Sequence, residues 1–311
     1  MFVGGEAKNL EAGPSESAGA GRRRLITRRR VLGSMLGSAG LAVGGAGYAY
    51  GIEPVWPAVT RLQMPLANLG PEFEGARLIQ ISDLHVGSSV PLDYLQKWID
   101  WIAGQQTDWV VVTGDLVHYS HHLAVGPMAR LVSRLRAREA VLTSLGNHEY
   151  GACRPGGGMA GLAQRAVNAL AGEGVRALRN EVVTFRRGRS ELHIVGMDDL
   201  WGEQYRPDVA FAALPSTAPT IVLSHNPDTF VDLLDRPFDW MLSGHTHGGQ
   251  VNIPLFGPPV LPVRHRQFAA GHSSLAGKNL YVNRGLGWVM RVRFNARPEV
   301  TIFTLRRAST T

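Results

Sequence analysis

The chain has a single cysteine, Cys153, among its 311 residues, and this scarcity excludes an intramolecular disulfide. Beyond residue 30 it also lacks internal repeats and any run of basic residues interleaved with aromatic ones. The net charge of that larger part is only +3, because residues 1–30 contribute +4 of the total of +7. So weak a positive charge gives little support for a polyanionic partner. We therefore expect a fold stabilised by its core and no nucleic-acid partner.

The first 50 residues differ in composition from the rest of the chain. Residues 1–21 are rich in Gly, Ala, Ser and Glu, a composition typical of disorder. Two clusters of arginine follow, and Val31–Tyr50 then contains no charged residue. A basic segment before an apolar one is the pattern of a secretory signal. Arg28 and Arg29, followed by weakly apolar and Gly-rich sequence, resemble a twin-arginine signal.

Residues 1–50 are therefore expected to form a disordered leader with either a twin-arginine signal or a membrane anchor. The anchor is the alternative because Val31–Tyr50 has about the 20 residues that a membrane span requires. Export would make the twin-arginine machinery a partner and would place the protein in the bacterial periplasm or on the outer face of the cytoplasmic membrane. Residues 51–75 are expected to be a linker and entry segment, and residues 76–311 a single large domain.

Five short motifs place polar side chains directly after apolar runs. They are Asp83-Leu84-His85, Gly114-Asp115, Gly146-Asn147-His148-Glu149, His225 after residues 221–224, and Gly244-His245-Thr246-His247. Short length, β-branched residues and terminal glycines indicate that the runs are strands. Helical patterns at 92–103 and 123–137 separate the first three runs, which predicts parallel pairing. Because ligands gather beyond the carboxyl ends of parallel strands, we expect the motifs to converge at one edge.

The converging side chains are typical of a metal site. Two Asp, one Asn and four His offer mixed oxygen and nitrogen ligands for two divalent cations, which can be manganese, zinc, iron or cobalt. Two metals about 3.5–4 Å apart promote the attack of water on a phosphate ester. Bound cations lower the pKa of water steeply, so that a metal-bound hydroxide can exist at neutral pH. The pattern therefore predicts a phosphoesterase centre.

In this order the motifs resemble those of the calcineurin-like metallophosphoesterases, D-x-H, G-D, G-N-H-D/E, H and G-H-x-H, over residues 76–305. The resemblance implies that one metal is bound by Asp83, His85, Asp115 and His247. It implies that the other is bound by Asp115, Asn147, His225 and His245, with Asp115 bridging. His148 would be the catalytic acid or would stabilise the leaving group, and Glu149 would orient its ring.

The sequence after the last motif narrows the resemblance. Residues 244–257, 284–287 and 293–300 are similar to the exported bacterial branch of that family, whose members are phosphodiesterases. Some of them act on lipid-linked nucleotide sugars such as UDP-2,3-diacylglucosamine. We therefore expect hydrolysis of a phosphodiester or pyrophosphate bond in the cell envelope, with a lipid-linked substrate and membrane association. The alternatives are a phosphomonoesterase, a nuclease with the same centre, and an inactive metal-bound binding protein, for which His148 would be unnecessary.

Three arginines are candidate contacts for the phosphate of the substrate, namely Arg154, Arg264 and Arg266. The first stands in a Gly-rich loop near His148, and the other two follow an apolar, Pro-rich run from Ile253 to Val263. This run is expected either to form a lip against lipid or to pack on the core. A solvated loop, with substrate contact as the alternative, is expected for His118, His121 and His122.

The remaining strand patterns predict the fold class. Further strands are expected at 182–185, 192–195, 250–253, 267–270, 280–283, 289–294 and 300–305. With the parallel strands that carry the motifs, they make two mixed sheets packed face to face with helices outside. This α/β/β/α four-layered sandwich is also the metallophosphoesterase fold that the resemblance implies.

Overall fold

The computed structural model describes residues 28–118, 122–152, 161–215 and 217–308. The chain divides into two units, Met1–Gly44 and Gly45–Thr311. Most of the uncharged run expected as a signal or anchor lies in the helix α1, Arg28–Gly47. The described apolar side chains of this helix, such as Leu36, are exposed. Within the ranges that the structure describes, no helix combines the length and the apolar character that crossing a membrane needs.

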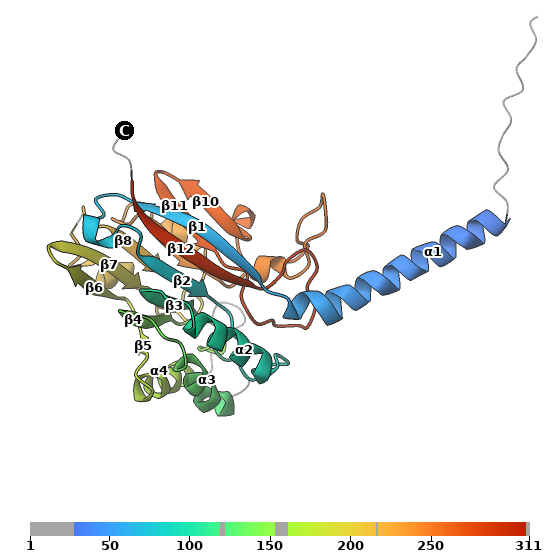
Figure 1. The fold of residues 1–311 in the computed structure, drawn as a ribbon, viewed down its shortest axis with the longest axis horizontal. Helices are drawn as coiled ribbons and strands as arrows, with labels where there is room; N and C mark the ends of the chain where they lie inside the picture. The colour runs from blue at the N-terminus through green and yellow to red at the C-terminus, as the bar shows by residue number, and fades with distance from the viewer. Residues whose placement is uncertain (1–27, 119–121, 153–160, 216, 309–311) are drawn as a thin grey trace, which may run out of the picture. The chain divides into compact units, whose positions relative to one another are not determined.

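The second unit contains two six-stranded sheets (Figure 1). The first has the order β1-β12-β2-β3-β4-β5 and consists of β1 Ala58–Leu66, β2 Arg77–Ile81, β3 Trp109–Thr113, β4 Ala140–Ser144, β5 Arg176–Ala177 and β12 Glu299–Arg307. The second has the order β10-β11-β9-β8-β7-β6 and consists of β6 Glu181–Arg187, β7 Ser190–Gly196, β8 Thr220–Leu223, β9 Trp240–Ser243, β10 Gly271–Leu275 and β11 Lys278–Val282.

Within the described residues, five helices accompany the sheets, with several single turns between them. The helices are α2 Leu92–Ala103, α3 Val125–Val132, α4 Leu162–Gly172, α5 Pro207–Phe211 and α6 Thr229–Asp232. The short turns are η1 Tyr48–Ile52, η2 Glu53–Val55, η3 Pro71–Phe73, η4 His122–Ala124, η5 His247–Gly249 and η6 Arg266–Phe268.

Alternation along the strands divides the apolar side chains between three cores. Trp109 and Val111 of β3 face the second sheet and join a core to which that sheet contributes Ile221. Their neighbours Val110 and Val112 face the other way, because successive side chains of a strand point to opposite faces. The strands are therefore apolar on both faces and need cover on both.

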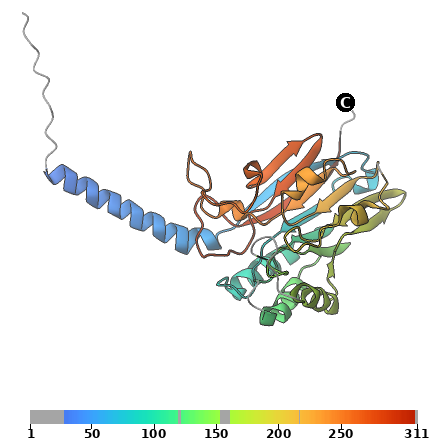
Figure 2. The same ribbon diagram turned by 180° about the vertical axis from the view of Figure 1, so that it is seen from behind.

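Helices supply the outer cover of both sheets. Residues of α2, α3 and α4 pack on the outer face of the first sheet, and residues of α5 and α6 pack on the outer face of the second. Figure 2 shows the same arrangement from behind. The expected four-layered α/β/β/α sandwich is confirmed.

Parallel pairing in both sheets brings the ends of the motif strands to one edge. Strands β2, β3, β4 and β5 are parallel, as are β7, β8, β9 and β11. Antiparallel pairs at β12–β2, β6–β7 and β10–β11 make both sheets mixed, as expected. The carboxyl ends of β2, β3 and β4 face those of β8 and β9 across the sandwich.

Five expected elements differ from the structure. The stretch 51–75, expected as a linker and entry segment, contains β1, which pairs with β12 along its whole length. The helix expected at 123–137 ends at Val132. Residues 267 and 268 belong to η6, and residues 269 and 270 form a bend, so this stretch is not a strand. Residues 250–253 and 289–294 share only an isolated bridge between Val251 and Phe294, because their apolar side chains line a cavity instead of a sheet.

Candidate metal centre

The first sheet supplies three turns of the site. Asp83 follows β2, Asp115 follows β3 and Asn147 follows β4, each within three residues of the strand end. Because these strands are parallel neighbours, the three side chains start at the same edge. All three are buried.

The second sheet supplies the remaining candidates. His225 follows β8, while His245 and His247 follow β9, and all three rings are buried. Among the described residues, three groups of side chains have potential ligand atoms within 4.8 Å of one another, and two of these groups contain a carboxylate. The two are Asp83, His85 and His247, and Asp115, His225 and His245, while the third consists of His85, His118 and His148. The expected convergence of the five motifs is therefore what the structure has.

The backbone is strained at most of these residues. A positive φ between 48° and 72° occurs at Asp83, His85, Asp115, His245 and His247. This left-handed conformation is uncommon for residues other than glycine. Such outliers cluster where function requires a particular side-chain position. The chain therefore bears strain at five of the seven residues expected to bind metal.

Two glycines are required by close approach. A Cβ on Gly146 would lie 2.3 Å from Oδ1 of Asp115. A Cβ on Gly244 would lie 2.3 Å from Oδ2 of Asp83. Each glycine belongs to one turn and admits the carboxylate of another, so the motif glycines bring the turns together.

The first group has the donor geometry that a metal ion needs. Nε2 of His85 and Nε2 of His247 lie 3.0 Å apart, and the second of these is 3.3 Å from Oδ1 of Asp83. Ligand atoms held about 2.0–2.2 Å from one ion lie roughly 3 Å from one another. Without a cation, the N–H of one ring can donate to the lone pair of the other in an N–H···N hydrogen bond. A cation between the rings would instead take the lone pairs of both, as metal ligation requires.

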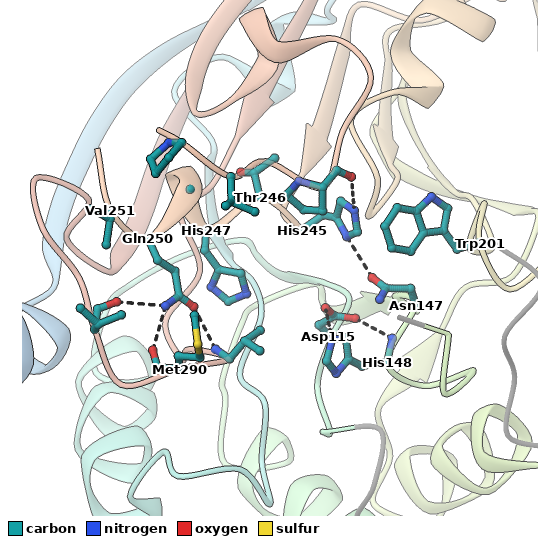
Figure 3. Close-up of a pocket in the computed structure, with 16 residues that line it drawn as sticks. Asp115, Asn147, His148, Trp201, His245, Thr246, His247, Gln250, Val251 and Met290 are labelled. Carbon is teal, nitrogen blue, oxygen red and sulfur yellow. Dashed lines mark hydrogen bonds and ion pairs between the residues drawn. The ribbon is translucent and has the colours of Figure 1, made fainter. Parts of the chain in front are cut away.

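The second group has similarly short distances between its potential ligand atoms, and backbone carbonyls hold its rings from the side away from the metal site. Oδ1 of Asn147 lies 3.2 Å from Nε2 of His225. It lies 2.9 Å from Nδ1 of His245 (Figure 3). The opposite nitrogen of each ring faces a backbone carbonyl, that of Thr113 at 2.7 Å and that of Pro262 at 3.0 Å. Such contacts fix the tautomer and leave the inward nitrogen free for a metal.

Asp115 lies between the two groups. Its Oδ2 is 3.7 Å from Nε2 of His85 in the first group and 3.2 Å from Nε2 of His225 in the second. Its Oδ1 accepts a hydrogen bond from the backbone N–H of His148 at 3.0 Å. Oδ2 is thus directed at both groups, while Oδ1 binds the backbone of the turn that carries His148.

Burial shifts the pKa values in this cluster toward the uncharged forms of the side chains. It raises the pKa of Asp83 to about 7 and lowers the pKa of His245 to about 3. For His225 the neighbouring carboxylate of Asp115 outweighs burial and raises the pKa to about 10. Metals bind neutral imidazole and ionised carboxylate, so a cation would restore the charge on Asp83 and displace the proton of His225.

His148 stands beside the two groups and reaches the cavity. Its Nε2 is 3.9 Å from Oδ2 of Asp115, and its ring centroid is 4.5 Å from that of His85. The ring of His118 is 5.1 Å away, so this histidine of the expected solvated loop is close to the site. Burial lowers the pKa of His148.

Glu149 makes contacts that differ from the expected ones. Its carboxylate accepts hydrogen bonds from the backbone N–H groups of Gly146 at 2.7 Å, Val117 at 2.9 Å and Asp115 at 3.1 Å. Burial raises its pKa to about 8. These bonds join the turns after β3 and β4, and the described contacts of Glu149 do not include the ring of His148. Glu149 is therefore better described as a brace between two turns.

A cavity of about 430 Å³ opens beside the two groups (Figure 3). Asp115, His148 and His245 form part of its wall. The rest of the wall is mainly apolar and consists of Trp201, Gly249, Val251, Pro259, Val260, Pro262, Val289, Met290 and Val292 with a few polar side chains. Any substrate that reaches the site therefore meets apolar surface as well as the polar cluster.

Of the arginines expected to bind phosphate, the two that the structure describes, Arg264 and Arg266, do not line this cavity. Arg264 borders a second cavity, together with Asp228 and Trp201, and its side chain is exposed. Arg266 donates a hydrogen bond to the carbonyl of Pro258. Arg154, like Cys153 and His121, lies outside the described residues.

Arg293 was not anticipated from the sequence. Its guanidinium is fully buried and donates hydrogen bonds to the carbonyl oxygens of Gly287 at 2.6 Å, Ala296 at 2.7 Å and Arg284 at 2.9 Å. It also lies 3.3 Å from Nδ1 of His247. A permanent cation at this distance disfavours the imidazolium and keeps His247 available as a ligand.

Asp198 and Asp199 were also missed. Asp198 accepts a hydrogen bond from Nε of Arg179 at 2.7 Å and another from the hydroxyl of Tyr150, which follows the third motif. Asp199 is buried, and its charge acts on His225. Both follow β7, which pairs in parallel with the strand before His225, so the rule that located the motifs applies here too.

The chain is similar to known proteins at the level of a family and of individual proteins. Residues 76–249 match the family model described as calcineurin-like phosphoesterase. The chain is 32% identical over 286 residues to phosphodiesterase YaeI of Escherichia coli, covering 90% of this chain and 100% of that protein. It is 31% identical over 290 residues to the uncharacterized metallophosphoesterase YkuE of Bacillus subtilis, covering 90% and 98%. It is 28% identical over 304 residues to the UDP-2,3-diacylglucosamine pyrophosphatase LpxG of Chlamydia trachomatis, covering 82% and 91%.

Proposed function

Because the chain belongs to the calcineurin-like phosphoesterase family, we propose that it hydrolyses a phosphodiester or pyrophosphate bond with two divalent metal ions. It is a metal-dependent phosphoric ester hydrolase, as its family and its relatives of named activity indicate. The proposal adds the number of ions, the residues that hold them and the substrate.

The position of Asp115 carries the proposal of two ions. Its Oδ2 is directed at one ring of each ligand group, which is the arrangement a shared ligand needs. One ion would be held by Asp83, His85, His247 and Asp115, and the other by Asn147, His225, His245 and Asp115. When bound, the ions would lower the pKa of a water molecule and offset the charge of the phosphate.

His148 would assist departure of the leaving group. Its ring borders the cavity and lies next to Asp115, and its own group of neighbours, His85 and His118, contains no carboxylate. A histidine at that place can donate a proton to the departing oxygen or hydrogen-bond to it. The backbone bond from His148 to Asp115 keeps the ring near the ions.

The cavity wall supports a substrate with an apolar part. Trp201, Val260 and Met290 offer surface on which an acyl or lipid group would be removed from water, at about 0.8 kcal/mol per buried CH₂. LpxG, one of the similar proteins, is named for a diacylated substrate. A lipid-linked phosphodiester or pyrophosphate is accordingly the proposed substrate class.

The first test is hydrolysis of bis(p-nitrophenyl) phosphate by the purified full chain. We expect turnover that is lost after chelation and restored by manganese, zinc, iron or cobalt, and slower turnover of p-nitrophenyl phosphate. Elemental analysis should find two metals per active chain. Faster turnover of the monoester would identify a phosphomonoesterase instead. A metal-loaded chain that turns over neither ester would be a binding protein.

We further propose that the protein is exported by the twin-arginine route. Its location would then be the periplasm or the outer face of the cytoplasmic membrane. It rests on Arg28 and Arg29 before the uncharged run. Replacing both by lysine keeps the positive charge but removes the guanidinium pair that the receptor reads. We expect the variant to be retained in the cytoplasm, measured by cell fractionation. Unchanged export would show that the general secretory route or a plain anchor carries the protein.

A further inference from the structure

Exposed apolar side chains surround the mouth of the cavity beside the metal centre. Leu255 is fully exposed, and the exposed fractions are 86% for Phe256, 73% for Val260 and 66% for Met290. Val289 is exposed as well, and three of the five, Val260, Val289 and Met290, also line the cavity. Single exposed apolar residues are ordinary, but a group continuous with a binding cavity marks an interaction surface. We call Leu255, Phe256, Val260, Val289 and Met290 the apolar rim.

The turn that carries Leu255 is built to present it. Ile253 donates a backbone hydrogen bond to Gly257 at 3.1 Å, and Gly257 donates one back at 2.8 Å. Leu255 lies between them with a φ of 70°, a left-handed conformation that glycine or asparagine would adopt more easily. The leucine therefore strains the turn and buries nothing in the free protein. Its side chain gains a favourable environment only when something covers the loop.

The loop with this turn is uncharged and stiff. Residues 251–263 contain no charged side chain and four prolines, which restrict the backbone and reduce the entropy lost when the loop is immobilised. It is drawn in orange in Figures 1 and 2, where it stands out from the sheets. Arg264 and Arg266 follow directly and are exposed. An apolar tip with arginines at its base matches the interface of a bilayer with anionic headgroups.

The two loops of the rim are fixed to each other and to the metal centre. The side-chain amide of Gln250 donates hydrogen bonds to the carbonyls of Met290 at 2.8 Å and Val292 at 2.9 Å, and it accepts one from the N–H of Val289 at 3.0 Å (Figure 3). Gln250 is three residues beyond His247. The rim therefore stands at a fixed position relative to the candidate ligands.

We infer that the apolar rim inserts into the surface of a lipid bilayer and seats the mouth of the cavity against it. A bilayer is favoured over a protein groove because the apolar side chains are exposed on two neighbouring loops that Gln250 joins, and because arginines adjoin the longer loop. A lipid substrate would then move from the bilayer into the cavity without crossing water. Membrane docking is separate from hydrolysis, so either can fail without the other.

A fluorescent probe at the tip tests the inference. With Cys153 replaced by serine, Leu255→Cys is labelled with the environment-sensitive dye NBD in the full chain. Vesicles of phosphatidylcholine and phosphatidylglycerol with spin-labelled acyl chains should shift its emission to the blue and quench it. Leu275→Cys is the matched control, because its 44% exposed side chain ends β10, at the opposite edge of the second sheet from the metal centre. This label should not respond.

The probe also separates the rim from the N-terminal segment. If the chain sediments with vesicles but the dye at position 255 emits as in water, another part of the protein binds the membrane and the inference is overturned. Absence of any sedimentation overturns it as well. A protein partner would likewise leave the dye unaffected by pure lipid.

Substitution of the tip provides an independent measure. The double variant Leu255→Ser, Phe256→Ser should bind the same vesicles at least roughly tenfold more weakly, as the loss of two inserted apolar side chains requires. Leu275→Ser should bind as the parent chain does. Both variants should hydrolyse bis(p-nitrophenyl) phosphate at the parent rate, which distinguishes lost docking from a lost metal centre. Unchanged vesicle binding by the double variant would refute the inference.

Discussion

Replacement of Asp115 by asparagine should lower the occupancy of both metals together and remove most of the turnover. The reason is that one oxygen, Oδ2, faces a histidine of each ligand group, so that a single charge serves both ions. The amide keeps the size of the side chain and can still accept the backbone bond from His148 through Oδ1. Mutation of a residue that only hydrogen-bonds to a metal ligand lowers metal affinity by roughly 10–100-fold. Because Asp115 is itself a proposed ligand, the affinity for each metal should fall by more than this.

Elemental analysis and metal titration of the Asp115→Asn chain provide the measurement. Asp83→Asn is the matched control, because Asp83 belongs to one ligand group only. It should weaken one ion more than the other, whereas Asp115→Asn should weaken both alike. A pair of ions retained at full affinity in Asp115→Asn, with turnover near that of the parent, would rule out the shared ligand.

The second large effect should follow from His148→Ala, which is expected to keep both metals and to slow turnover by roughly 10²–10⁴. Metal binding should persist because His148 belongs to neither ion's proposed ligand set. The loss should be greatest for esters with poor leaving groups and smaller for nitrophenyl esters, since a nitrophenolate departs without needing a proton. The measurement is kcat for both ester types at equal metal content.

The matched control for this variant is His272→Ala, which removes an exposed ring on β10 and should leave kcat unchanged. Equal losses on good and poor leaving groups would exclude a purely acidic role for His148. A loss of metal in His148→Ala would instead make the residue a ligand.

The strand ends of the site were predictable because the apolar strand patterns and the helical patterns between them indicated the same parallel arrangement. Runs such as residues 109–112 are apolar on both faces, which indicates a strand covered on both sides, and the helical pattern at 92–103 makes the neighbouring strands parallel. Parallel strands fix the edge at which Asp83, Asp115 and Asn147 must meet. The strand ends of the second sheet were harder to predict from the sequence. Asp199 was missed because the strand before it, β7, ends at Gly196 and is not followed by a recognised motif.

Other parts of the molecule could not be derived from local sequence. Apolar β-branched residues at 289–294 suit a strand, yet they line a cavity, and only tertiary contacts distinguish the two. Strand β1 was missed because its partner, β12, lies more than 200 residues away. Arg293 gave no sign of burial, since its five carbonyl acceptors and His247 come together only in the fold.

Each proposed ion would join the two halves of the sandwich. Asp83 comes from the first sheet and His247 from the second, and the same division separates Asp115 from His225. Neither sheet holds a complete ligand set, so the layers must be packed before a metal can bind, and a bound metal then opposes their separation. In a chain that has no internal disulfide, the ions would serve as cross-links. Loss of metal should therefore loosen the packing between the layers as well as stop the chemistry.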